Sequence, residues 1–304
     1  MLPAIINRNL LVLHITVVVW GITGILGNLI SIGAIDLVWY RVLIAAASLL
    51  VYFVATRRSV LVTRDRLVRF VLTGGLVGLH WILFFESIKV STVSVALVCL
   101  SAVTLFTAMF EPIIYKRRVS KMEIVTGLVV IVGIWLIFKF ESQYVKGILF
   151  GLLAALTACF FAIINSKLVK KSEPSIISFY EMVGAFFWIS LYLLISGGFA
   201  EMKPVSAPDF AYLLLLGTVC TSGAYVAAVS VMKEISAFRV ALASNLEPIY
   251  GVVLAFAFFG QAEVMSTGFY VGALLILGAV FLHPVIRMRI DRRKALKTEL
   301  PLHP

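Results

Sequence analysis

The sequence predicts an all-α polytopic membrane protein with ten transmembrane helices, arranged as two inverted five-helix repeats. Three observations lead to this fold class. About ten apolar segments are long enough to cross the roughly 30 Å hydrocarbon core of a bilayer. The second half of the chain repeats the pattern of the first half. Basic residues gather in alternate gaps between the apolar segments, which is typical of loops on the cytoplasmic side.

Composition excludes a soluble protein. Hydrophobic residues make up 62% of the 304 residues and charged residues only 13%, and the mean hydropathy is +1.06. A soluble domain has roughly 45–50% apolar and about 25% charged residues. The net charge of +11 does not indicate a nucleic-acid partner, because the basic residues form short clusters between apolar segments. Cys99, Cys159 and Cys220 lie within apolar segments without metal-ligand spacing, so we expect no metal site and no cofactor.

Each apolar segment has about the 20 residues that a spanning helix needs. We expect the first segment to be retained, because it is too long for the apolar core of a signal peptide. The expected spans are residues 10–31, 35–55, 68–88, 91–115, 121–138, 147–168, 175–197, 208–229, 236–259 and 266–286.

The distribution of Lys and Arg predicts the orientation of these spans. With a cytoplasmic N-terminus, most of the 26 basic residues fall in the inner segments, and the outer segments hold only Lys89, Lys139, Lys146 and Lys203. We therefore expect an integral protein of the cell (inner) membrane with both termini in the cytoplasm. A basic cytoplasmic tail is expected at residues 289–304.

The internal repeat sets the predicted domain boundaries. Residues 89–97 align with residues 234–242 at an offset of 145, and Gly127 and Gly133 meet Gly272 and Gly278 at the same offset. These glycines allow close approach of helices. Trp39 and Tyr40 meet Phe179 and Tyr180 at an offset of 140. Five crossings in each copy place the second copy upside down, so we expect repeats at residues 1–140 and 141–288.

Glu247 is the leading candidate for substrate binding or proton coupling. It lies near the middle of the ninth expected span, and Pro248 removes a backbone donor beside it, which predicts a helix kink. Carboxylates at interrupted helices can carry a proton or bind a cationic group; the alternative is a hydrogen-bonded structural residue. Glu111 and Pro112 repeat this dipeptide closer to the cytoplasm, where we expect a second kink and an interfacial Glu111 beside Arg117.

Arg41, inside the second span, can bind a carboxylate group through two parallel hydrogen bonds. The alternatives are a salt bridge to Glu86 or extension of the side chain toward the membrane surface. Glu181 is expected to pair with Lys167 or Lys170 near the inner surface.

Further candidates can provide aromatic surfaces or hydrogen bonds to a substrate. His80 is either a proton relay or a hydrogen-bonded residue of the bundle. Aromatic side chains more often pack against each other, and polar side chains by default join helices. The candidates are His80, Trp81, Trp20, Tyr180, Tyr225, Asn165, Ser244 and Asn245.

Several short motifs resemble the EamA family of the drug/metabolite transporter superfamily. They are Trp20-Gly21, Arg41 followed by Ala45-Ala46-Ala47, Leu246-Glu247-Pro248, and the glycines Gly272 and Gly278. The resemblance implies a ten-helix inverted-repeat fold in which the fifth and tenth helices are peripheral. It also implies small polar or amphipathic substrates, amino acids among them, and frequent export. The sequence departs from the family at Gly260–Glu263 and at Lys116, Arg117 and Arg118, where the family often has Gly-Glu.

We therefore predict a secondary transporter that moves a small metabolite, an amino acid or a related amphipathic compound, by alternating access, with protons as a candidate coupling ion. The alternative is an intramembrane lipid-modifying enzyme, which would need a convergent set of catalytic groups. A structural or assembly role is a third hypothesis, and it predicts no polar cavity at the middle of the membrane.

Overall fold

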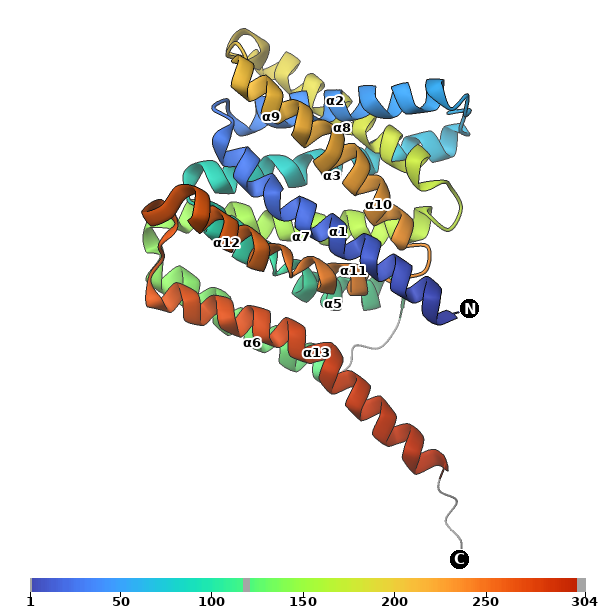
Figure 1. The fold of residues 1–304 in the computed structure, drawn as a ribbon, viewed down its shortest axis with the longest axis vertical. Helices are drawn as coiled ribbons and strands as arrows, with labels where there is room; N and C mark the ends of the chain where they lie inside the picture. The colour runs from blue at the N-terminus through green and yellow to red at the C-terminus, as the bar shows by residue number, and fades with distance from the viewer. Residues whose placement is uncertain (1, 117–120, 300–304) are drawn as a thin grey trace, which may run out of the picture.

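A computed structural model describes residues 2–116 and 121–299. Helices dominate this part of the chain and run back and forth along one direction (Figure 1). The elements are α1 (Leu2–Leu29), α2 (Ala34–Ala55), α3 (Arg64–Val90), α4 (Val93–Leu100), α5 (Val103–Ile114), α6 (Lys121–Phe140), η1 (Ser142–Tyr144), α7 (Val145–Leu168), α8 (Pro174–Ser196), η2 (Gly198–Ala200), α9 (Ala207–Gly217), η3 (Thr218–Gly223), α10 (Ala224–Val231), α11 (Ala237–Ser244), α12 (Glu247–Phe259), η4 (Gly260–Glu263) and α13 (Thr267–Glu299).

Eight helical stretches of the described chain are long and apolar enough to cross a membrane. They correspond to the expected spans other than the fifth and the tenth. Those two coincide with α6 and α13, in which the described apolar stretches, Ile124–Phe140 and Thr267–Ala279, are shorter. The chain is thus an all-helical membrane protein. Side chains beyond Ile286 lie outside the described residues, as does Arg117, so the expected basic tail and the expected proximity of Glu111 to Arg117 are not placed.

Local sequence signals set several helix boundaries. Pro174 opens α8, where its missing N–H leaves no bond unmade, and Gly197 ends this helix in the left-handed conformation with φ of 76°. Ser206 begins α9 by accepting a hydrogen bond from the Asp209 amide at 3.2 Å. Thr92 begins α4 in the same way through the Val95 amide.

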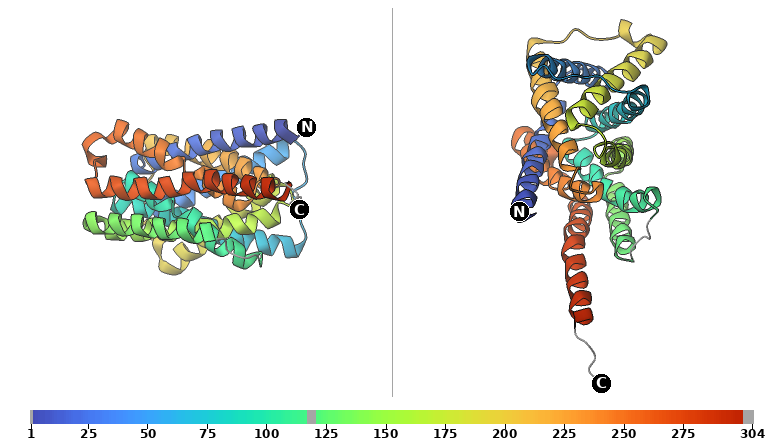
Figure 2. Two further views of the ribbon diagram at one scale, coloured as in Figure 1. Left: turned by 90° about the horizontal axis from the view of Figure 1, so that it is seen from below. Right: turned by 90° about the vertical axis from the view of Figure 1, so that its right-hand side faces the viewer.

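The main core is formed by α1–α5, α7, α8 and the segments α9–α12, and a smaller cluster joins α6 and α13 to α4, α5 and α7. Figure 1 shows α6 and α13 side by side at the edge of the bundle, and Figure 2 shows α13 extending beyond it. The N-terminal end of α1 and the C-terminal end of α13 lie toward the same end of the bundle.

Glycines let α6 and α13 approach closely at one level but not at another. A Cβ atom on Gly272 would lie 2.7 Å from the carbonyl oxygen of Gly133, and one on Gly133 would lie 2.8 Å from that of Gly272. This contact confirms the expected close approach at these two positions. The expectation is wrong for Gly278, because a Cβ there would meet nothing within 4 Å.

Carboxylates tie the helices together at the end of the bundle where α1 meets α2. Asp209 accepts hydrogen bonds from the amide and the hydroxyl of Ser31, at 2.8 and 2.7 Å. The ammonium group of Lys89 donates to the carbonyl oxygen of Ile30. Glu263 accepts from the amides of Val93 and Ser94, at 3.0 and 2.9 Å, so the turn that departs from the family pattern holds the start of α4. We call Asp209, Ser31, Lys89 and Glu263 the latch.

Candidate functional site

A cavity of about 100 Å³ lies in the middle of the helix bundle. Eight of the ten predicted binding or coupling candidates line it, and so does the predicted kink residue Pro248. These residues come from sequence positions far apart and from both halves of the chain. The lining consists of Trp20, Thr23, Arg41, His80, Trp81, Phe84, Leu100, Ser101, Val103, Ala158, Phe161, Tyr225, Ser244, Asn245, Glu247 and Pro248.

Two spans are interrupted where they meet this cavity. One is broken at Ser101 and Ala102, between α4 and α5, and the other at Asn245 and Leu246, between α11 and α12. Pro248 explains the second break, because it lacks an amide donor and occupies the first turn of α12. The two breaks touch, since the Asn245 amide nitrogen donates to the Thr104 hydroxyl at 2.5 Å. Interrupted helices expose polar backbone groups, which membrane proteins use to bind substrates.

Pro112 behaves differently from Pro248. It lies inside α5, and the break in this span occurs ten residues earlier, at Ser101 and Ala102. The kink expected at Pro112 stays a prediction. The break at Ser101 has no proline or glycine to mark it in the sequence, so periodicity and composition gave no signal for it.

Arg41 is one of the largest fully buried side chains, with 1% of its surface exposed. Its Cζ atom lies 4.0 Å from the centre of the Trp81 ring, a cation–π contact, and its Nε donates to the Thr221 hydroxyl at 2.6 Å. The proposed salt bridge to Glu86 and the extension toward the surface are therefore both wrong. Nη1 is buried without a hydrogen-bond partner, so the guanidinium keeps a donor for a further group.

A π-helical turn aims Thr221 at Arg41. In η3 the hydroxyls of Thr221 and Ser222 donate to carbonyl oxygens five residues earlier, those of Leu216 and Gly217, at 2.6 and 2.9 Å. The extra residue in such a turn rotates the following side chains relative to a regular α-helix, and π-turns are frequent at functional sites. Thr221 accepts from Arg41 while donating to the backbone, which fixes both groups.

Glu247 is the first residue of α12 and is 7% exposed. Its carboxyl group stands at a helix N-terminus, where the backbone dipole favours negative charge. Arg41 lines the same cavity, yet no ion pair within 4.0 Å joins it to Glu247 among the described residues. The cavity therefore presents a cation and a carboxyl group that do not neutralise each other by direct contact.

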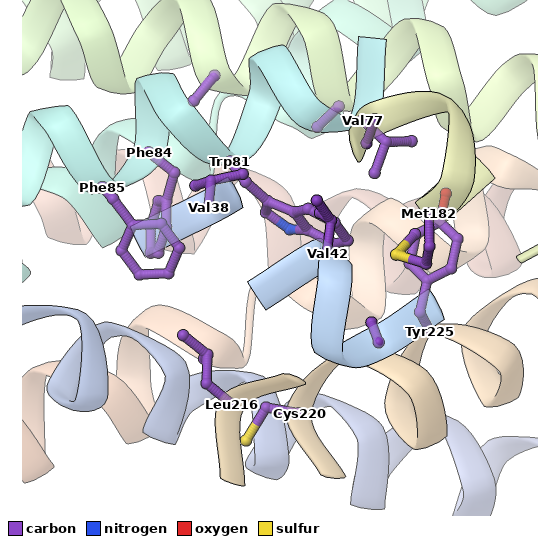
Figure 3. Packing of buried hydrophobic residues seen from close by; sticks show 14 of the residues in the cluster. Val38, Val42, Val77, Trp81, Phe84, Phe85, Met182, Leu216, Cys220 and Tyr225 are labelled. Carbon is purple, nitrogen blue, oxygen red and sulfur yellow. The ribbon is translucent and has the colours of Figure 1, made fainter. Parts of the chain in front are cut away.

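His80 and the aromatic side chains form the apolar walls. The Nδ1 of His80 lies 2.9 Å from the Ala154 carbonyl oxygen, and since a carbonyl only accepts, Nδ1 carries the proton. The Trp81 and Tyr225 rings meet edge to face with centres 5.8 Å apart. Figure 3 shows Trp81 extending from α3 toward Val42, with Tyr225 beside Met182.

Two predicted candidates lie outside the cavity lining. The Tyr180 hydroxyl donates at 2.8 Å to the carbonyl oxygen of Val60, which lies in the segment between α2 and α3. Asn165 is buried behind the cavity and donates to Tyr225 and Glu181. The expected pairing of Glu181 with Lys167 or Lys170 is wrong: Lys167 lies over the Tyr115 ring, and Lys170 donates to the Lys233 carbonyl oxygen.

Sequence analysis missed seven lining residues: Thr23, Phe84, Leu100, Ser101, Val103, Ala158 and Phe161. Most are apolar, and an apolar residue in a membrane helix carries no mark that separates a cavity wall from a lipid-facing or packed side chain. Thr23 had a weak signal, since it lies one turn after Trp20 on α1 and so faces the same side of the helix.

Comparisons with known proteins identify the fold and the family of this chain. A crystal structure of another protein superimposes with a TM-score of 0.67 at 14% identity, covering 92% of this chain and 98% of that one, which shows a shared fold. A protein of Clostridium kluyveri described as an uncharacterized transporter is 24% identical over 221 residues, 69% of this chain and 68% of the relative. The model of the EamA-like transporter family matches residues 8–139 and again residues 145–283. These matches point to transport rather than to enzymatic activity, and the chain belongs to the EamA-like transporter family.

Proposed function

We propose that this membrane transporter moves a small zwitterionic metabolite, such as an amino acid, out of the cell by alternating access. The observation that carries this proposal is the central cavity, which is lined by Arg41 of the continuous helix α2 and by Glu247 at the break between α11 and α12, with no direct ion pair between them among the described residues. A polar cavity at this depth is the feature that a purely structural or assembly role would lack.

Different residues of the cavity can bind the carboxylate, the ammonium group and the side chain of such a substrate. Arg41 has a free donor for a carboxylate, and Glu247 can receive an ammonium group. The rings of Trp20, Trp81 and Tyr225 provide surfaces for an apolar or flat side chain. A cavity of about 100 Å³ favours a compact molecule.

Alternating access follows from two inverted five-helix repeats, at residues 1–140 and 141–288, that rock against each other around the cavity. The family model matches once in each of these segments, which supports the division. In this proposal the hydrogen bonds of the latch hold one end of the bundle, and breaking them would open the cavity on that side. We place both termini in the cytoplasm of a cell-membrane protein, because basic residues concentrate at that end.

Transport in proteoliposomes under an imposed pH gradient tests the function directly. A thermal-shift screen of the purified protein against amino acids selects the radiolabelled compound. We expect export to depend on pH, and Glu247→Gln to remove that dependence because an amide cannot bind and release a proton. Glu234→Gln, at an exposed position beside Asn9, is the matched control and should behave as the unmodified protein. If Glu247→Gln leaves rate and pH dependence unchanged, Glu247 carries no proton; if no compound is bound or exchanged, the substrate class is wrong.

A further inference from the structure

Behind the cavity, three side chains from three helices form a closed hydrogen-bonded group, which we call the carboxyl triad: Glu181, Asn165 and Tyr225. The Tyr225 hydroxyl donates to Glu181 Oε2 at 2.8 Å. The Asn165 amide nitrogen donates to the same oxygen at 3.2 Å and to the Tyr225 hydroxyl oxygen at 3.0 Å. All three residues are buried, and Glu181 has 0% of its surface exposed.

No cation accompanies this carboxyl group. The helices packed against α8 are α2, α3 and α10, together with the short η2 turn. Arg41 of α2 is directed to Trp81 and Thr221, His80 of α3 to Ala154, and Arg69 of α3 to Asp65 at 3.2 Å. The titratable side chain of α10 that contacts Glu181 is Tyr225. From α7, the uncharged side chain of Asn165 contacts Glu181. Within the described residues, no Lys or Arg nitrogen lies within 4.0 Å of Glu181.

Such surroundings suit a group that gains and loses a proton. A carboxylate without a cation is costly to keep charged in an apolar interior, whereas the neutral acid is much less so. The partners of Glu181 can serve both forms: a tyrosine hydroxyl donates or accepts, and an asparagine amide presents either its NH₂ or its oxygen after a half turn. Glu181 Oε1 and Asn165 Oδ1 are both buried without a hydrogen-bond partner, so the triad has unused capacity for the added proton.

Tyr225 connects the triad to the cavity. Its side chain lines the cavity, and its hydroxyl contacts Glu181. Its ring also touches Trp81, on which the Arg41 guanidinium lies. Three successive side-chain contacts therefore connect Glu181 to Arg41, the residue that would bind a substrate carboxylate.

We propose that Glu181 is a proton-binding site that exchanges protons with the central cavity through Tyr225. In this step the O–H bond of Tyr225 breaks as a new O–H bond forms on Glu181 Oε2. The phenol oxygen takes a proton from a hydronium ion in the cavity, which leaves as water, so Tyr225 ends neutral and no electrons are transferred. The proton site is additional to Glu247. Its role in coupling depends on the proposed transport function, but its protonation does not.

Infrared spectroscopy of the purified protein in lipid nanodiscs tests this proposal without a substrate, with protons as the probe. The C=O stretch of protonated carboxylic acids is followed between about pH 4 and pH 9, a range that includes the values known for buried glutamates. We expect a titrating band from which Glu181→Gln removes one component. Glu247→Gln and the exposed control Glu234→Gln should both leave the component that Glu181→Gln removes in place.

Tyr225→Phe gives a second measurement that keeps the carboxyl group. Loss of the hydroxyl donor should shift the frequency of the Glu181 component and slow its response to a pH jump. Size-exclusion chromatography checks that each variant is folded. If Glu181→Gln does not fold, the measurement on Tyr225→Phe tests the proposal. An unchanged titrating band in Glu181→Gln, or an unchanged frequency and rate in Tyr225→Phe, would overturn the proposal. Absence of transport in proteoliposomes would instead contradict the proposed function and leave the titration result standing.

Discussion

Arg41 in the first half of the chain and Glu181 in the second half are both buried ionisable groups, yet their surroundings differ. Each is the eighth residue of its helix, α2 or α8. Arg41 faces the cavity and is held by the Trp81 ring and the Thr221 hydroxyl. Glu181 lies behind the cavity and is held by Tyr225 and Asn165.

The difference follows from the chemistry of the two groups. A guanidinium group stays protonated in proteins, so it requires partners that suit a permanent cation, such as an aromatic face and a hydroxyl oxygen. A carboxyl group can be neutral, so partners that both donate and accept are sufficient. The first half thereby contributes a fixed charge to the cavity, and the second half contributes Glu247 to the cavity and Glu181 behind it.

The largest effect is expected from removal of the fixed charge. Arg41→Met should reduce transport by more than about tenfold, equivalent to more than about 1.4 kcal/mol, because the substrate carboxylate loses its cation. Arg41→Lys should restore transport only in part, since an ammonium group has no planar fork for a carboxylate. Radiolabelled exchange in proteoliposomes measures both.

Two variants of Thr221 test whether the function of Arg41 depends on the hydrogen bond that orients its guanidinium group. Thr221→Val removes the hydroxyl that accepts from Nε and should weaken substrate binding less than Arg41→Met does. Thr221→Ser keeps the hydroxyl and should resemble the unmodified protein. Full transport by Arg41→Met would mean that Arg41 does not bind the substrate carboxylate and that the fixed charge of the first half has no role in the cavity.

A smaller effect, on stability, is expected in the second half. Glu181→Leu leaves the Tyr225 hydroxyl and the Asn165 amide buried without their acceptor, which should lower the free energy of unfolding by about 1 to 3 kcal/mol. Glu181→Gln keeps an oxygen acceptor and should cost less. Thermal unfolding in detergent compares the two variants, and equal stability of Glu181→Leu and the unmodified protein would show that the triad is not a hydrogen-bonded unit.

The all-helical membrane fold and most of the cavity were predictable because a bilayer constrains sequence strongly. Polar groups such as Arg41, Glu247 and Asn245 are costly in lipid, so their presence within apolar spans indicates a cavity or a buried partner. Eight of ten candidates line the cavity for this reason.

The partner of each group was less predictable, because it depends on helix rotation and on local irregularities. The π-turn at η3 directs Thr221 to Arg41, and no residue in it distinguishes it from a regular helix in the sequence. Glu181 was expected near lysines that are close in sequence number. Helix packing instead turns it inward, toward Tyr225 and Asn165.

The smallest effects are expected where the two halves meet at α6 and α13. An exact two-fold relation at an offset of 145 would pair Gly127 with Gly278 just as Gly133 pairs with Gly272. Instead, a Cβ on Gly127 would meet a Leu105 methyl group at 2.8 Å, and one on Gly278 would meet nothing within 4 Å. The two helices are therefore in close contact at one level only, and the halves depart from exact symmetry there.

Matched alanine substitutions measure this departure. Gly272→Ala places a methyl group 2.7 Å from the Gly133 carbonyl oxygen and should destabilise the protein by about 1 to 3 kcal/mol. Gly278→Ala enters open space and should be neutral or stabilising by up to about 1 kcal/mol, because alanine favours the helix over glycine. Thermal unfolding of the two variants side by side gives the difference. Equal destabilisation by both would mean that α6 and α13 stay in contact along their length, as exact two-fold symmetry of the halves requires.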